Sequence, residues 1–350
     1  MFYHLFQYLE ELNLPGAGVF QYITFRSACA IILSLALTIL GGKKMIRLLQ
    51  KQQIGEEIRD LGLAGQMEKK GTPTMGGIIF ILSTIITLLI LFIFKKLDMS
   101  YNFIIVVFVF VSYGLIGLID DSLIIFKKDN KGLKASTKMN MQIVIAIIFF
   151  YLFMKADNEP LLWIHTIGFK LNIGWLYGLF ILLVLTSSSN AVNLTDGLDG
   201  LATGLSIIAF LTFGLISYNT GWLEGYKEIS LFCFALVGSL LGFLTYNHHP
   251  ASIFMGDTGS LALGASLGSI AILTRHEILF LVIGFVFLIE TISVIIQVSF
   301  YKLTKKRVFL MTPLHHHFEK KGFKEETIVK LFWIIGLISS LLAISFGLII

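Results

Sequence analysis

The side chains of this chain that are best suited to chemistry are five carboxylates and three consecutive histidines. They lie in short polar segments between long apolar runs, at Asp120, Asp121, Asp196, Asp199, Asp257, His315, His316 and His317. Charged groups beside membrane hydrocarbon are costly, so their retention favours a functional site. Carboxylate oxygens suit a hard cation, which offsets the charge of an anionic substrate. The set therefore indicates a metal-assisted site for an anionic substrate.

Asp120 and Asp121 directly follow an apolar run, in the string Gly-Leu-Ile-Asp-Asp. Adjacent carboxylates repel each other unless a cation lies nearby, and Mg²⁺ is the ion that such a pair would hold beside a phosphate. They could instead be solvated acids at the end of a helix, although a helix C-terminus disfavours negative charge. We expect both to be catalytic.

A second acidic segment runs Asn190-Ala-Val-Asn193-Leu-Thr-Asp196-Gly-Leu-Asp199-Gly. Asp196 and Asp199 are three residues apart and share a face if the segment turns helically. Its glycines let backbone amides approach a ligand closely. Asn, Asp and Gly are also the composition of an ordinary tight turn. However, this segment holds six such residues within eleven, more than a turn needs.

A third polar segment, 247–259, contains Asn247, Phe254 and Asp257. Phe254 is an aromatic residue in a polar loop, able to stack on a base, and Asp257 offers a further oxygen ligand for a metal. The alternative makes Phe254 an anchor at the membrane interface and Asp257 the N-cap of the next helix. We expect Asp257 to be the metal ligand.

The three histidines lie in the string Pro-Leu-His315-His316-His317-Phe-Glu. Neighbouring residues on a helix point about 100° apart, so the three imidazoles cannot all ligate one metal ion from a helix. Hydrogen bonds to pyrophosphate oxygens, together with proton transfer, suit them better. A solvated histidine run is the alternative.

Two further features are weaker signals. Lys69 and Thr74 belong to Lys-Lys-Gly-Thr-Pro-Thr-Met-Gly-Gly, which enters an apolar run and resembles an anion seat at a helix N-terminus. Glu290 and Gln297 are seven residues apart inside an apolar run and therefore share a helical face. An acid inside the membrane is a functional candidate, but hydrogen bonding between helices explains it equally well.

Composition places these segments in a polytopic membrane protein. The chain has 350 residues, of which 56% are hydrophobic and only 14% charged. A membrane span needs about 20 apolar residues, and runs near that length recur ten times. They lie near 19–40, 75–94, 101–119, 139–154, 174–189, 200–218, 229–246, 260–273, 277–301 and 328–350. We therefore predict an all-α membrane protein with about ten transmembrane helices in a single domain over 1–350.

The distribution of Lys and Arg predicts the orientation. The loops after odd-numbered spans, with the last one counted over 302–330, hold 20 of these residues and the other side holds seven. This puts the odd loops in the cytoplasm and both termini outside. Those cytoplasmic loops lie near 41–74, 120–138, 190–200, 247–259 and 302–327. All five carboxylates and the histidines fall in them, so we predict an active site at the cytoplasmic face.

Taken together, these strings resemble those of the bacterial phospho-N-acetylmuramoyl-pentapeptide transferases. This family belongs to the polyprenyl-phosphate N-acetylhexosamine-1-phosphate transferase superfamily. The resemblance covers the chain from about residue 40 to the last span, with every motif in the family's order. The matching strings are KKGTPTMGG, GLIDD, NAVNLTDGLDG, FMGDTGS and PLHHHFE.

The resemblance implies a Mg²⁺-dependent reaction in the bacterial cytoplasmic (inner) membrane. UDP-N-acetylmuramoyl-pentapeptide and undecaprenyl phosphate would give lipid I, a peptidoglycan precursor, and UMP. Asp257 would ligate Mg²⁺, Asp120 and Asp121 would act on the lipid phosphate, and His316 and His317 would be catalytic. The implied substrate-binding residues are Lys69, Thr74, Asn190, Asn193, Asp196, Asp199, Asn247, Phe254, His315 and Gln297. The partners are the two substrates and the bilayer, without nucleic acid; a homodimer is left open.

Alternatives remain at this stage. Asp257 could be a nucleophile in a two-step reaction through a covalent phosphosugar enzyme. The superfamily also contains transferases of N-acetylglucosamine phosphate, which the triple-histidine string disfavours. A transporter or flippase would need polar residues through several spans, and the spans here are mostly apolar. A structural membrane protein would have no use for the polar loops.

Overall fold

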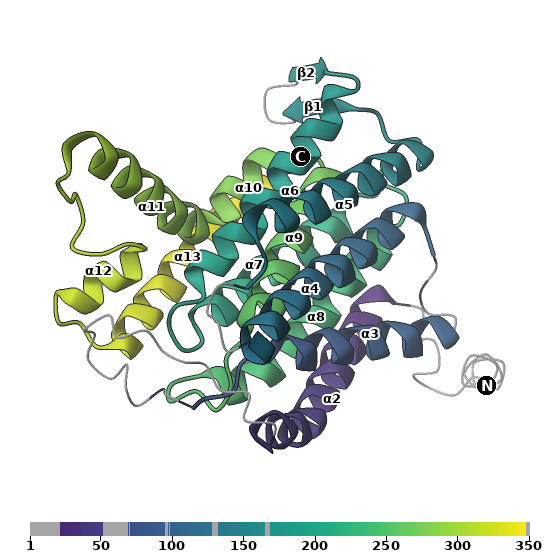
Figure 1. Ribbon diagram of the computed structural model, residues 1–350. Coiled ribbons are helices and arrows are strands. Elements are labelled where there is room, and N and C mark those ends of the chain that lie inside the picture. The colour runs from purple at the N-terminus through teal and green to yellow at the C-terminus, as the bar shows by residue number, and fades with distance from the viewer. Residues whose placement is uncertain are drawn as a thin grey trace.

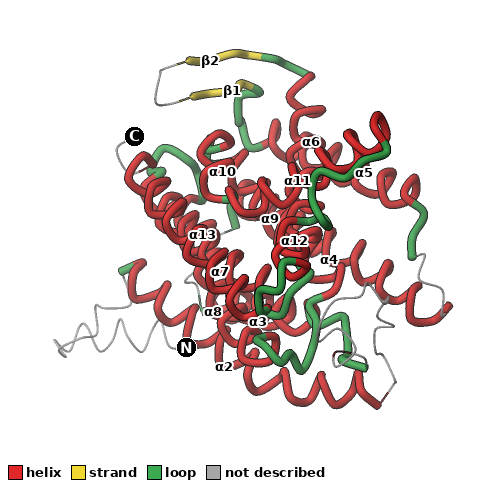
Figure 2. The backbone as a smooth tube through the Cα atoms, turned by 90° about the vertical axis from the view of Figure 1, so that its left-hand side faces the viewer, coloured by secondary structure: helices red, strands yellow, loops and turns green. Residues whose placement is uncertain are grey.

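The computed structural model describes residues 22–51, 69, 71–94, 97, 99–127, 132–164 and 169–347. Over these residues the chain is a bundle of helices with one short β-hairpin at one end (Figures 1 and 2). The helices are α2 (Ile23–Lys51), α3 (Gly77–Ile93), α4 (Tyr101–Lys127), α5 (Ala135–Lys155), α6 (Leu176–Thr195), α7 (Leu201–Asn219), α8 (Tyr226–Asn247), α9 (Gly256–Leu273), α10 (Glu277–Ile283), α11 (Phe285–Thr304), α12 (Leu314–Lys320) and α13 (Glu325–Gly347).

Each of the ten predicted apolar runs is covered mostly by helix, and the prediction of a helical polytopic membrane protein is confirmed. Eight helices within the described ranges are long and apolar enough to cross a membrane. The predicted span over 277–301 differs, because α10 and α11 meet at Gly284, whose ψ of 21° departs from helical geometry. The full count of ten spans stays a prediction.

The helix α9 lies at the centre of the bundle and is rich in small residues. It packs against α3, α4 and α6, and nearly all of its side chains are buried. A Cβ atom on Gly117 of α4 would collide with the backbone of Asp257, and one on Gly77 of α3 would collide with Gly259. Small residues let helix backbones approach closely without a hydrophobic driving force. This contact fixes the start of α9 against α3 and α4.

Two helices continue past the ends of their apolar runs. We predicted Asp120 and Asp121 at the end of a helix, but α4 runs on to Lys127, so both lie inside it. Likewise, α6 extends to Thr195 and includes Asn190 and Asn193. Backbone hydrogen bonding does not stop where apolar side chains stop, so the end of a hydrophobic run is not the end of a helix.

The β-hairpin lies at the end of the bundle opposite the α6–α7 connection, because α6 starts beside it and runs away from it (Figures 1 and 2). Its strands, β1 (Leu161–Ile164) and β2 (Phe169–Asn172), pair antiparallel with Leu161 opposite Asn172. Buried Arg275 donates hydrogen bonds to the carbonyls of Glu159 and Leu161 and so ties the hairpin to the bundle. This hairpin was not among the elements predicted from the sequence.

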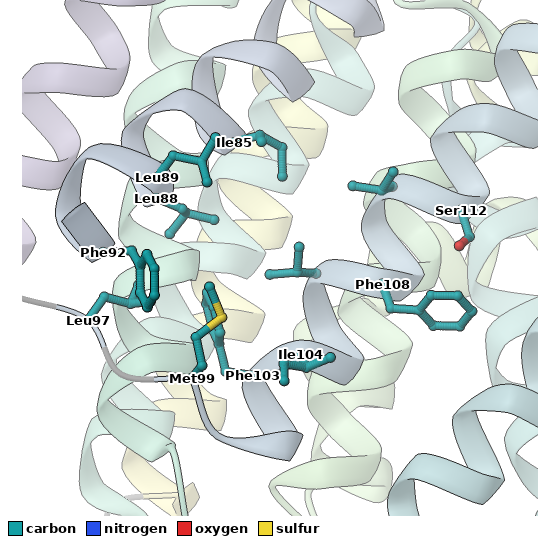
Figure 3. A pocket seen from close by; sticks show the side chains of 12 residues that line it. Ile85, Leu88, Leu89, Phe92, Leu97, Met99, Phe103, Ile104, Phe108 and Ser112 are labelled. Carbon is teal, nitrogen blue, oxygen red and sulfur yellow. The ribbon is translucent and has the colours of Figure 1, made fainter. Parts of the chain in front are cut away.

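A cavity of about 370 Å³ lies between α3 and α4 (Figure 3). Its lining is apolar: Leu88 and Phe92 of α3 face Phe103 and Ile104 of α4. None of the lining residues is titratable. The cavity is therefore separate from the polar loops that the sequence analysis singled out.

Candidate active site

The predicted site residues gather into two polar clusters joined by the segment 190–200. The first, here called the Asp257 cluster, consists of Asp120, Lys138, Asn193 and Asp257. The second, the Asp199 cluster, consists of Lys69, Asp199, His249 and Glu325. The end of α6 supplies Asn193 and the turn that follows supplies Asp199, so one short segment contributes to both clusters.

In the Asp257 cluster, both carboxylate oxygens of Asp257 are engaged by side chains from other helices. Asn193 Nδ2 donates to Oδ1 at 2.6 Å, and Lys138 Nζ lies 2.8 Å from Oδ2. Asn193 also donates to Ser260 Oγ at 2.9 Å, which fixes its amide. Four helices, α4, α5, α6 and α9, thus converge on one carboxylate.

Asp120 reaches the same point from α4. Its Oδ2 lies 3.5 Å from Lys138 Nζ, its Oδ1 accepts the backbone N–H of Leu133 at 2.5 Å, and its carboxyl group contacts that of Asp257. Two carboxylates therefore share one ammonium group, which leaves an excess of negative charge. Such an arrangement of oxygen donors favours an additional cation.

Asp121, the neighbour of Asp120, has a different environment. Its carboxylate accepts three hydrogen bonds from the first turn of α9, namely the backbone N–H groups of Asp257 (3.1 Å) and Thr258 (3.0 Å) and the hydroxyl of Thr258 (2.6 Å). An acid at a helix N-terminus satisfies otherwise unpaired N–H groups. Asp121 therefore holds the helix that carries Asp257. Its predicted catalytic role is not tested by this geometry.

The segments that carry Thr74 and Phe254 pair with each other through the backbone. Phe254 N–H donates to Pro73 O at 2.8 Å, and Gly76 N–H donates to Phe254 O at 2.8 Å. A Cβ atom on Gly256 would lie 2.9 Å from Thr74 Oγ1 and 2.6 Å from Asp121 Oδ2. Thr74 is therefore next to the start of α9.

The Asp199 cluster is an ion-pair network among four distant segments. Lys69 Nζ lies 2.7 Å from Asp199 Oδ1 and 2.6 Å from Glu325 Oε1. Glu325 also accepts the backbone N–H of Asp199 at 2.7 Å, and His249 Nδ1 lies 3.0 Å from Asp199 Oδ2. Burial alone would lower the pKa of Lys69, but the two carboxylates outweigh it and raise this pKa above its usual value. Lys69 is thus a fixed cation at this position.

Asp199, His249 and Glu325 offer donor atoms within 4.8 Å of one another, a spacing that could hold a metal ion. The ammonium group of Lys69 already bonds two of the three residues. A cation is therefore supplied to this cluster by the chain itself. In the Asp257 cluster Lys138 likewise serves two acids, Asp120 and Asp257.

Two predicted substrate-binding asparagines have internal partners. Asn247 is buried; its amide accepts from Thr203 at 2.6 Å and donates to Ile253 O at 3.0 Å, which braces the loop before α9. Asn190 donates to Thr186 O on its own helix at 2.8 Å and is exposed. Asp196 is half-buried just after α6. Substrate contacts of these three residues stay predictions.

The three histidines occupy three different environments on α12. His315 is fully buried and packs on Gly197, where any Cβ atom would collide with its ring. His316 Nδ1 lies 2.6 Å from Glu319 Oε2. His317 Nδ1 accepts the backbone N–H of Leu310 at 3.1 Å. Partial burial and the nearby Lys321 lower the pKa of His317. The three rings therefore have different neighbours.

Gln297 lies on α11, where its Oε1 accepts the backbone N–H groups of Val308 and Phe309, each at 3.0 Å. The side chain thus holds the chain segment that leads to α12. Its predicted contact with substrate is not tested by these bonds.

Comparison with known proteins then decides the family. A family model described as Glycosyl transferase family 4 matches residues 102–275, and a signature described as phospho-N-acetylmuramoyl-pentapeptide-transferase signature 1 matches residues 69–81. The phospho-N-acetylmuramoyl-pentapeptide-transferase of Staphylococcus saprophyticus is 46% identical over 319 residues, which cover 90% of this chain and 98% of the relative. The chain belongs to the phospho-N-acetylmuramoyl-pentapeptide-transferase family.

Relatives from distant bacteria agree with this membership. The transferase of Flavobacterium johnsoniae is 40% identical over 98% of both chains. The transferase of Limosilactobacillus reuteri is 45% identical over 92% of this chain and 98% of its own length. The family signature spans Lys69 and Thr74, and the longer match spans the Asp257 cluster. The predicted resemblance to the transferase family is therefore confirmed.

Within this transferase fold, the sequence analysis missed three residues that the geometry brings to the site: Lys138, His249 and Glu325. Lys138 was counted only as one of the basic residues that set the orientation. Glu325 starts the last helix and has the composition of an ordinary helix-starting acid. The weak signal for each was a charged residue next to an apolar run, a position common to many residues without a function.

Proposed function

We propose that the two clusters form a single cytoplasmic active site for lipid I synthesis. There the chain transfers phospho-N-acetylmuramoyl-pentapeptide from UDP-N-acetylmuramoyl-pentapeptide to undecaprenyl phosphate, which releases UMP and serves peptidoglycan biosynthesis. Family membership supports the reaction. The observation that supports the location is the convergence of Lys138, Asn193 and Asp120 on Asp257.

The proposed side of the membrane follows from charge. Lys and Arg are concentrated in the loops that carry the site, and such loops face the cytoplasm. A water-soluble nucleotide substrate and a lipid phosphate at the membrane surface can meet there. We place the chain in the bacterial cytoplasmic membrane, with both termini outside.

Mg²⁺ is the proposed cofactor, with Asp257 as the residue that would hold it. The fit rests on the donor chemistry, because two carboxyl groups in contact share a single ammonium group and carboxylate oxygens are the ligands Mg²⁺ prefers. When bound, Mg²⁺ would neutralise charge on the phosphates.

Asp120 is the proposed general base. A lipid phosphate that carries a proton would give it to Asp120, and the freed oxygen would form a bond to the β-phosphorus of the nucleotide sugar. The bond from that phosphorus to the oxygen of the α-phosphate would break, and UMP would leave with the electron pair. Phosphoryl transfer depends mainly on positioning and on electrostatic stabilisation of this kind. Asp121 supports the reaction by holding α9 in place.

The Asp199 cluster is the proposed seat of the nucleotide. Lys69, Asp199, Asn247 and Phe254 would surround the uridine. Thr74, Asn190, Asn193 and Asp196 would lie nearer the phosphates or the sugar. Because Lys69 is fixed by two carboxylates, it costs little further side-chain entropy when it meets a ligand.

The proposed histidine contacts differ between His316 and His317. His317 accepts a hydrogen bond at Nδ1, so its neutral ring carries its proton at Nε2 and can donate to a phosphate oxygen. His316 directs Nδ1 to a carboxylate, which leaves Nε2 to accept a proton or a hydrogen bond. The pair thus offers a hydrogen-bond donor to the pyrophosphate at His317 and a proton acceptor at His316.

A one-step transfer is favoured over a covalent phosphosugar enzyme. Both oxygens of Asp257 are engaged by Lys138 and Asn193, whereas a nucleophile needs a free oxygen in line with the phosphorus. Incubation with the nucleotide sugar alone should release no UMP. Release of UMP without lipid phosphate, or a trapped phosphosugar adduct, would favour the two-step alternative.

The substrate assignment is tested with purified protein in detergent, Mg²⁺ and undecaprenyl phosphate. UDP-N-acetylmuramoyl-pentapeptide and UDP-N-acetylglucosamine are offered in turn, and UMP and the lipid product are measured. We expect both products only with the muramoyl nucleotide. Products only with UDP-N-acetylglucosamine would overturn the assignment, and omission of Mg²⁺ tests the cofactor.

A further inference from the structure

The histidines of α12 lie on an arm of the fold rather than in its centre. Figure 1 shows α11 extending away from the rest of the bundle, with the chain returning through α12 to α13. Loop residues 305–313 between α11 and α12 contain exposed Lys305, Lys306 and Arg307. A segment of this kind needs specific contacts if it is to present His316 and His317 at a fixed position.

One such contact joins Glu290 of α11 to His315. Both side chains are fully buried, at 0% exposure. Glu290 Oε1 lies 3.2 Å from the backbone N of His315, which donates to it, and 3.3 Å from the ring Nδ1. A buried acid inside the membrane is expensive, so it persists only where its partners compensate for the cost. The acid and the imidazole are therefore best understood as a pair.

The pair reaches the active site through the imidazole. The ring of His315 packs directly on Gly197, in the turn that carries Asp196 and Asp199. On its other side it contacts the ring of His316, with centroids 4.2 Å apart. Glu290 Oε2 and both ring nitrogens of His315 have no hydrogen-bond partner among the described residues. The contacts of Glu290 and His315 thus connect α11 to the Asp196–Asp199 turn and to His316.

The same face of α11 also contacts the loop 305–313 nearer its start. Gln297, seven residues after Glu290, accepts hydrogen bonds from Val308 and Phe309. Phe309 in turn packs edge-on against His317 at 5.8 Å. Residues seven apart lie on one helical face. A single polar face of α11 therefore holds the chain at Val308 and Phe309, through Gln297, and at His315, through Glu290.

We infer that Glu290 is a positioning residue that acts through His315. It holds the start of α12 so that His316 and His317 are presented beside the Asp196–Asp199 turn. This inference rests on the proposed function, since the reaction is what the positioned histidines serve. If Glu290 only joined two helices, its loss would change stability without a specific effect on turnover.

A double-mutant cycle separates the two possibilities. The variants are Glu290→Gln, which keeps the shape of the side chain, His315→Asn and the double substitution. We expect Glu290→Gln to lower kcat about ten-fold while KM for the nucleotide sugar changes less than about three-fold. Because both substitutions break one link, the double variant should be no worse than the more impaired single variant. Glu228→Gln, at a buried acid on α8, is the matched control and should behave as the unmodified chain.

A second measurement does not require the reaction. Labelling of imidazoles by diethyl pyrocarbonate, located by mass spectrometry, should leave His315 unmodified in the unmodified chain and in Glu228→Gln. His315 should become modified in Glu290→Gln and Glu290→Ala. Protection of His315 in both Glu290 variants, or multiplicative effects on kcat in the cycle, would overturn the inference. If the chain lacked the proposed activity, the labelling result would still show whether Glu290 holds His315 in its buried position.

Discussion

Lys138 Nζ lies 2.8 Å from Oδ2 of Asp257, and these two residues are 119 positions apart in the chain. The same ammonium group lies 3.5 Å from Asp120. One lysine of α5 thus joins the acids of α4 and α9, which would otherwise repel each other. Its positive charge offsets the repulsion between the two carboxylates, as a site for phosphoryl transfer requires.

Loss of this cation is the first prediction. Lys138→Gln should lower kcat about 100-fold, a loss typical of removing one electrostatic contact from an active site. UMP release measures the effect. Lys134→Gln, an exposed lysine one helical turn earlier, is the control and should retain full activity. Activity within about three-fold of the unmodified chain in Lys138→Gln would remove this lysine from the site.

A second prediction concerns the nucleotide side. Glu325→Gln weakens the hold on Lys69 and on the backbone of Asp199, so KM for the nucleotide sugar should rise about ten-fold with a smaller change in kcat. Initial rates over a range of nucleotide concentrations give both constants. Glu326→Gln is a close control, since Glu326 is exposed and lies 3.7 Å from Lys330. An unchanged KM in Glu325→Gln would contradict this assignment.

Substitutions of the two adjacent acids of α4 should differ in their effects on stability and turnover. Asp121→Asn replaces an acceptor of three hydrogen bonds with a group that is partly a donor, so it should destabilise the fold by about 1–3 kcal/mol. Asp120→Asn should abolish turnover with little change in thermal stability. Exposure of the buried thiol of Cys233 to a thiol-reactive dye during heating reports unfolding. Equal melting temperatures for the two variants would argue against this division.

The close approach of α4 and α9 gives a further prediction. Gly117→Ala forces a methyl group into the backbone at Asp257, which should cost about 1–3 kcal/mol of stability and displace Asp257 from Lys138. The melting temperature and the rate of UMP release should both fall. Gly41→Ala provides the control, because a Cβ atom there meets nothing within 4 Å. If both alanine variants melted at the same temperature, the close helix contact would be in doubt.

The pKa of His317 can be tested directly. Burial and Lys321 lower it, so the neutral ring that accepts from Leu310 persists to lower pH than for a free histidine. The stability that this hydrogen bond contributes is present above the usual histidine pKa and is lost as pH falls through the lowered value. Lys321→Gln should raise the pKa of His317 in an NMR titration of labelled histidines. No upward shift relative to Lys324→Gln would contradict the effect of Lys321.

The sequence predicted the helical fold well because a membrane span is a local signal. Ten apolar runs correspond to helices in the structure. The break at Gly284 and the continuation of α4 past Asp121 were not predictable from hydropathy. The first depends on one residue's backbone angles, and the second on a helix that continues in polar surroundings.

The residue types of the site were also predictable, but their partners were not. Asp120, Asn193 and Asp257 do come together, as their chemistry suggested. Lys138 and Glu325 were missed because an isolated charge beside an apolar run has no local pattern that marks it. Asn247 looked like a ligand-binding residue, yet its amide is bonded to Thr203 and Ile253. Contacts across more than 40 residues of chain decide such cases.

The central claim is that transfer occurs at the Asp257 cluster. The direct test measures UMP and lipid I made by purified Asp257→Asn with Mg²⁺, undecaprenyl phosphate and UDP-N-acetylmuramoyl-pentapeptide. Asp157→Asn, an acid just beyond the far end of α5, serves as the control. We predict no turnover above background in Asp257→Asn and full turnover in Asp157→Asn. Near-normal formation of lipid I by Asp257→Asn would contradict the account.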